Sequence, residues 1–142
     1  MLLLMGCRNR RHQNRRHQPH VVHRIITQGL PGLESLALSG NVVDRRACRA
    51  IGALRALTGL ELLHCSALTD SDVCLLEPLT SLQRVGLVNC ENVTDIGIAR
   101  LLRACRGLRH VQLAHVPKVT ALSLQALHGL ALITLDLSGS QV

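Results

Sequence analysis

The chain has 142 residues, a net charge of +7 and no Phe, Tyr or Trp. This length favours a single domain, and its core must be built from Leu, Val, Ile and Ala. The missing aromatic side chains leave any binding surface without the anchors that dominate most protein interfaces. No apolar run approaches the roughly 20 residues of a membrane-spanning helix, so the sequence predicts no membrane span.

The first 20 residues are predicted to form a basic, disordered arm, because a composition of Arg, His, Gln and Asn cannot build a core. Two readings of this arm stay open. One is a solvated tail without a binding role. The other is binding of nucleic acid or of an anionic surface through its basic side chains, which are Arg8, Arg10, Arg11, Arg15 and Arg16.

Residues 21–142 are expected to form one repeat domain. Val21, Val22, Ile25 and Ile26 share one helix face and predict the helix of a partial first repeat. Five rows follow on one template, L-x-x-L-x-L-x-x-N/C, with Val allowed for Leu and a small or apolar residue allowed in the last slot. The rows are 24, 25, 26 and 24 residues apart, starting at Leu33, Leu57, Leu82, Leu108 and Leu132. A fixed period over five rows indicates a stack of repeated units.

The spacing of apolar residues changes inside each unit. It is near two around Leu-x-Leu, which predicts a short strand, and then three to four, which predicts one face of a helix. Asp44, Thr69, Thr94 and Thr120 stand at the change and supply N-cap oxygens. The last row stops after its strand and before its helix.

The last slot of the template is predicted to form a structural column of small, buried side chains: Asn41, Cys65, Cys90, Val116 and Ser140. A cysteine in this slot acts as a small buried group with a weak donor. A metal or redox role is the alternative, but no His or acid shares the column and the chain has no CxxC pair. We therefore expect no metal and no cofactor. The start "MLLLMG" is too short for a signal peptide, so we expect reduced thiols in the cytoplasm or nucleus.

The strings "LTGLELLHCSALTD" at residues 57–70 and "LQRVGLVNCENVTD" at residues 82–95 resemble the leucine-rich repeat (LRR), and in particular the cysteine-containing type of F-box/LRR proteins. This resemblance implies an α/β solenoid shaped like a horseshoe, with short parallel strands on the concave side and helices on the convex side. It also implies a protein-interaction module, and substrate recognition in a ubiquitin ligase. Residues 1–28 are too few and too polar to form the F-box that binds the ligase adaptor, so that link would require a segment missing from this chain.

The strand residues that alternate with the core leucines are predicted to face the concave side and to bind a protein ligand. The distinctive ones are Glu61, Leu63, Arg84, Val88, His110, Gln112 and Asp136. The alternative is a solvated sheet surface without a ligand. No P-loop, HExxH or G-x-S-x-G motif is present, so the sequence does not predict an enzyme.

Overall fold

The structure is a computed structural model that describes residues 2–4, 22, 27–28, 32–40 and 42–142. It is an α/β fold with an open, parallel, six-stranded sheet whose strands follow one another in chain order. The strands are β1 (Leu2–Leu4), β2 (Ser35–Ser39), β3 (Gly59–Leu63), β4 (Arg84–Val88), β5 (His110–Gln112) and β6 (Thr134–Asp136). The predicted strands of all five rows are thereby confirmed.

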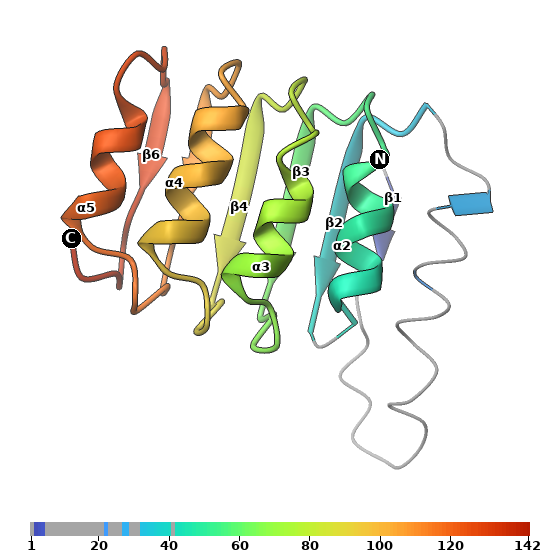
Figure 1. The fold of residues 1–142 in the computed structure, drawn as a ribbon, viewed down its shortest axis with the longest axis horizontal. Coiled ribbons are helices and arrows are strands. Elements are labelled where there is room, and N and C mark those ends of the chain that lie inside the picture. The colour runs from blue at the N-terminus through green and yellow to red at the C-terminus, as the bar shows by residue number, and fades with distance from the viewer. Residues whose placement is uncertain (1, 5–21, 23–26, 29–31, 41) are drawn as a thin grey trace.

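One helical segment follows each strand from β2 to β5, and Figure 1 shows these segments side by side on one face of the sheet. The segments are α2 (Arg45–Gly52), α3 (Asp70–Val73), α4 (Asp95–Ala104) and α5 (Ala121–Leu124). Two of them are short and continue as 3-10 turns, η1 (Cys74–Leu76) after α3 and η2 (Gln125–Leu127) after α5. We call each strand from β2 to β6, together with the helical segment that follows it where there is one, a coil. None of the helices in the described part of the chain is long and apolar enough to cross a membrane.

The register of the sheet aligns the repeated leucines. Leu36 pairs with Leu60, Leu60 with Val85, Val85 with Val111 and Val111 with Leu135. The first four are at most 3% exposed and point towards the helices. Leu135 differs, with 41% of its surface exposed, because β6 is the last strand and no helix among the described residues covers it.

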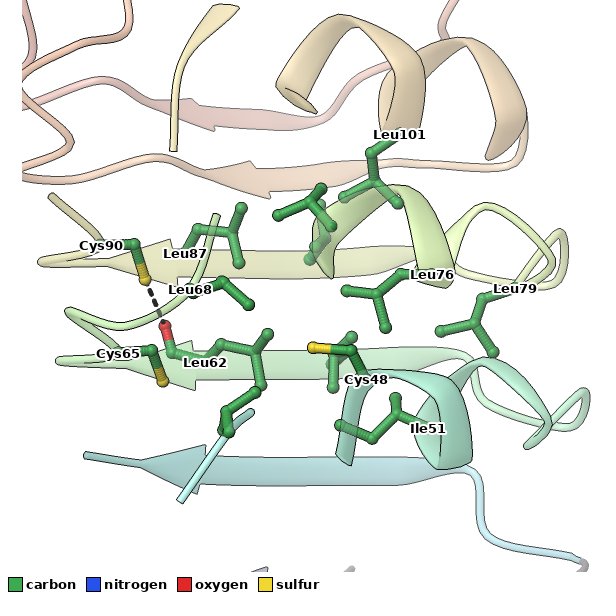
Figure 2. Packing of buried hydrophobic residues seen from close by; sticks show 14 of the residues in the cluster. Cys48, Ile51, Leu62, Cys65, Leu68, Leu76, Leu79, Leu87, Cys90 and Leu101 are labelled. Atoms are coloured by element: carbon green, nitrogen blue, oxygen red, sulfur yellow. Dashed lines mark hydrogen bonds between the residues drawn. The ribbon is translucent and has the colours of Figure 1, made fainter. Parts of the chain in front are cut away.

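The core fills the space between the sheet and the helices. Leu62, Leu68, Leu76 and Leu87 interdigitate there at 0% exposure (Figure 2). Full burial of such a side chain stabilises the fold by roughly 1.5–3 kcal/mol. Aliphatic side chains and buried cysteines therefore supply the volume that aromatic residues provide in most domains.

Strand β1 corrects one prediction. The sequence places Leu2–Leu4 in the basic arm, whereas the structure pairs them in parallel with β2, Leu2 with Leu36 and Leu4 with Leu38. The free edge of β2 offers unpaired backbone groups, and a short apolar segment can satisfy them. Residues 5–20 and most of the predicted first helix lie outside the described residues. Val22 is described, and it is helical and buried.

A left-handed residue follows each strand from β2 to β6, within three residues of its end. Gly40, His64, Asn89, His115 and Gly139 have φ of 80°, 55°, 54°, 54° and 70°. Each one directly precedes the last slot of the repeat template. The left-handed conformation turns the chain from the strand into the loop, and it favours glycine because a Cβ is crowded there. Three of the five coils accept this strain with a His or Asn.

The Thr-Asp pairs connect neighbouring coils. The carboxylate of Asp70 accepts hydrogen bonds from the amide and the hydroxyl of Thr94, at 2.8 and 2.6 Å. The carboxylate of Asp95 accepts the equivalent bonds from Thr120, at 2.8 and 2.7 Å, and a third from the amide of Ser123 at 3.2 Å. The hydroxyls of Thr94 and Thr120 also cap their own helices, which confirms the predicted N-caps at these two positions. We call this arrangement the Thr–Asp ladder.

Candidate functional site

The face of the sheet opposite the helices, called the outer face here, carries the residues that alternate with the core leucines. The register aligns two rows of them across all strands from β2 to β6. The first row is Ser35, Gly59, Arg84, His110 and Thr134, and the second is Ala37, Glu61, Gly86, Gln112 and Asp136. The predicted alternation therefore brings residues from five coils onto one surface.

A hollow of about 270 Å³ opens on this face. Its lining is Glu61, Arg84, Val85, Gly86, His110, Val111, Gln112, Thr134 and Asp136. Five residues predicted to bind a protein ligand thus surround one depression: Glu61, Arg84, His110, Gln112 and Asp136. The other two, Leu63 and Val88, pair directly across β3 and β4, are half-buried and do not line the hollow.

Gly86 forms the floor of the hollow. A Cβ atom at this position would lie 3.4 Å from Cγ of Glu61 and 3.7 Å from Oε1 of Gln112. The two side chains therefore flank a site where the strand has no side chain of its own. The sequence-based prediction missed Gly86, although a glycine inside a strand often marks a place where another group approaches the backbone.

Hydrogen bonds hold one side of the hollow in place. Nε2 of Gln112 donates to Oδ2 of Asp136 at 3.3 Å, and the amide of Ser138 donates to Oδ1 at 3.0 Å. The bond from the Ser138 amide is the main reason why the pKa of Asp136 lies below its usual value, so this carboxylate is charged at neutral pH.

His110 and Thr134 form a further cross-strand contact, with Nδ1 2.9 Å from Oγ1. This pair lies on an exposed sheet surface that does not exclude water. It therefore lacks the enclosed environment in which a hydroxyl nucleophile is activated.

Two opposite charges in the hollow have no partner within the described part of the chain. Glu61 and Arg84 are both exposed, and neither makes a hydrogen bond or an ion pair with another described residue. Nε of Arg84 lies 3.8 Å from the position that a Cβ of Gly59 would take, so the arginine lies over that glycine. The ion pair that the described residues do contain joins Arg100 and Glu77 at 2.7 Å, away from the outer face. Both charges on the outer face are therefore available to a ligand.

Three members of the structural column lie inside the molecule. Cys65, Cys90 and Val116 are 0% exposed, Ser140 is half-buried, and Asn41 lies outside the described residues. The Cys90 thiol donates to the carbonyl of Leu62 at 3.6 Å (Figure 2), and the Cys65 thiol donates to the carbonyl of Leu63 at 3.5 Å.

The chemistry of Cys65 fits packing better than reactivity. The neighbouring Cys90 thiol and burial raise the pKa of Cys65, which disfavours the reactive thiolate. The five cysteines among the described residues are free. No cluster of three or more potential metal ligands occurs in the described ranges.

A second depression, of about 440 Å³, lies among the loops that follow the strands. Its lining is Asn89, Glu91, Asn92, His115, Pro117, Lys118 and Gly139. The amine of Lys118 donates to Oδ1 of Asn92 at 2.9 Å, so its charge is partly engaged. This lining contains none of the residues predicted to bind a ligand.

No model of a known protein family matches the chain, and no curated protein sequence matches it.

Proposed function

We propose that the chain is a leucine-rich-repeat solenoid that binds a protein ligand through the outer face of its sheet. Two findings support the repeat assignment. The sequence has five rows on one template, and the sheet gains one parallel strand per coil, with α2, α3, α4 and α5 on its other face. In such solenoids the strands line the concave side, which is the usual binding surface. The outer face corresponds to that side in this proposal.

One observation carries the binding role. The hollow unites residues of four strands and contains two opposite charges, Glu61 and Arg84, that have no partner among the residues the structure describes. Charged groups that lack intramolecular partners can give orientation and specificity to a protein interface. The aliphatic pair Leu63 and Val88 adds apolar area beside them. The ligand would therefore be held by polar contacts around a small apolar strip.

The test uses a substitution that fills the hollow. A Gly86→Val variant places a β-branched side chain in the middle of β4, where the backbone suits it and the nearest groups are flexible side-chain atoms. The matched control is Gly32→Val, because a Cβ at Gly32 would have no atom within 4 Å. Proteins captured from cell extract by the wild type are compared with those captured by both variants, and the ligand identified is then purified.

We expect the purified ligand to bind the wild type and Gly32→Val equally, and Gly86→Val at least about tenfold more weakly, as for a disturbed central contact. Calorimetry measures both constants. A ligand whose affinity is unchanged by Gly86→Val and by Glu61→Arg would rule out binding through the outer face.

The resemblance adds a narrower proposal, that the ligand is a substrate of a ubiquitin ligase. The adaptor of such a ligase should then co-purify with this protein when it is isolated from cells. If the protein is purified from cells and no adaptor is bound to it, the link to a ligase is refuted. The proposed binding of a protein ligand is not affected by that result.

Binding of nucleic acid or of an anionic surface through the arm stays a prediction, because Arg8, Arg10, Arg11, Arg15 and Arg16 lie outside the described residues. Deleting residues 1–20 would also remove β1. Replacing these arginines by glutamine is the cleaner test. If the arm binds phosphates, this change removes an affinity that otherwise falls steeply with salt concentration.

A further inference from the structure

The hollow presents acceptors on both sides of Gly86. Cγ of Glu61, the atom that bears its carboxylate, flanks one side at 3.4 Å from the Cβ position of Gly86, and Oε1 of Gln112 flanks the other at 3.7 Å. Gln112 already uses Nε2 to donate to Asp136. Its remaining group near Gly86 is therefore a carbonyl oxygen, which accepts hydrogen bonds and cannot donate them.

The charge of the hollow also favours a ligand that donates hydrogen bonds. Its lining contains two carboxylates, Glu61 and Asp136, and one guanidinium, Arg84, so its formal charge is −1 with histidine counted as neutral. The guanidinium side chain lies over Gly59 in the adjacent row, beside the Gly86 floor rather than on it. A cation placed over Gly86 would therefore meet carboxylate and amide oxygens.

The volume limits what can enter. About 270 Å³ is slightly below the 300–1,000 Å³ range of pockets for small molecules and cofactors, so the hollow suits one long side chain. We propose that it receives an arginine side chain of a protein ligand, with the guanidinium donating to Glu61 and to Oε1 of Gln112. This inference rests on the proposed binding role of the outer face and specifies its chemistry.

Arginine fits better than lysine because the two acceptors belong to β3 and β5, which flank the floor strand β4. A guanidinium presents five donors in a planar fork and can reach acceptors on opposite sides at once. An ammonium group is a compact point charge that favours one acceptor at a time. The geometry thus favours a fork-shaped donor.

The experiment is a titration followed by nuclear magnetic resonance, with N-acetyl-arginine amide as the probe. The readouts are the backbone amide of Gly86 and the side-chain amide of Gln112. We expect saturable shifts at both, with a Kd on the order of 1–10 mM for a single side chain on an open face. The citrulline analogue, which has nearly the same shape without the charge, and the Glu61→Gln variant should each weaken binding at least tenfold. The Glu91→Gln variant changes an exposed acid outside the hollow and should bind like the wild type.

Three results would overturn the proposal. The first is equal binding of the citrulline and arginine probes. The second is stronger binding of N-acetyl-glutamate amide, which would assign the hollow to an anion held by Arg84. The third is a dimer in sedimentation that Glu61→Gln dissolves, since the occupant would then be a second copy of this chain.

Failure here can be told apart from failure of the binding role. A protein ligand that is lost in Gly86→Val while the arginine probe gives no shift would refute the arginine site alone. A ligand that tolerates Gly86→Val would refute binding through the outer face, whatever the probe does.

Discussion

Substituting Asp95 by alanine tests the Thr–Asp ladder. The change removes three hydrogen bonds to a carboxylate, from the amide and hydroxyl of Thr120 and from the amide of Ser123. Bonds to charged groups contribute about 1.5–3 kcal/mol each when shielded from water. Asp95 is partly exposed, so hydrogen bonds to water replace part of this free energy in the variant. For comparison, the loss of a helix cap costs about 0.5–2 kcal/mol. We expect Asp95→Ala to lower the free energy of unfolding by about 2–3 kcal/mol.

The pH dependence sharpens this prediction. Burial acts to raise the pKa of Asp95, but the hydrogen bonds from Thr120 and Ser123 outweigh it, so the net shift is downward. A carboxyl group whose pKa is lower in the folded state stabilises that state fully above its unfolded pKa of about 3.9, and the stabilisation is lost as the pH falls through the folded pKa. The difference between wild type and variant should therefore be constant from about pH 5 to 7 and shrink below about pH 4.

Urea unfolding at a series of pH values measures this difference. Glu91→Ala is the control, because Glu91 is an exposed acid from the loop before α4 and stands outside the ladder. The reasoning would be refuted if the two variants lost the same stability within about 0.5 kcal/mol, which is the usual range for surface changes. A difference that stayed constant down to pH 2 would refute the assignment to the charged carboxylate.

Three further predictions concern buried and strained residues. Cys90→Ser should lower the thermal midpoint less than Cys90→Leu, because the extra atoms of leucine overpack a fully buried slot by about 1–3 kcal/mol; equal midpoints would contradict this. Burial raises the pKa of Cys48 to about 12 and that of Cys105 to about 11, so neither thiol should react with a thiol reagent at pH 8 until urea unfolds the chain, as mass spectrometry would show. His64→Gly should raise the unfolding free energy by about 0.5–1 kcal/mol by relieving a φ of 55°, and a less stable variant would show that the His64 side chain outweighs that strain.

The coil architecture could be predicted from the sequence because each row contains the same signals in the same order. Leu-x-Leu fixes the strand and its buried face, and a Thr or Asp fixes the helix start. Strand β1 could not be found in this way. Leu2–Leu4 belongs to no row and pairs with a strand that is distant in sequence. A pairing of three residues with a strand far away in the sequence produces no repeating pattern from which it could be predicted.

The outer-face residues of the hollow follow from the alternation, whereas the hollow itself does not. It depends on the missing side chain of Gly86 and on how Glu61 and Gln112 lie beside it. The link between coils was missed for a different reason. The N-cap bond of Thr94 within its own helix already explains a threonine at this position. The sequence therefore gives no sign of its additional bonds to Asp70 in the preceding coil.

The Thr–Asp ladder has a direction. Each acceptor carboxylate belongs to the earlier coil and each donor threonine to the later one, while α3 begins with its own capping box between Thr69 and Asp72. When the later coil opens, Asp95 merely becomes hydrated, but when the earlier coil opens, the first amides of α5 lose their acceptor. The chain should thus fray from its C-terminal end, and amide hydrogens should exchange with solvent first in α5, later in α4 and last in α3. The coils of the stack would then unfold one after another, starting at the C-terminal end.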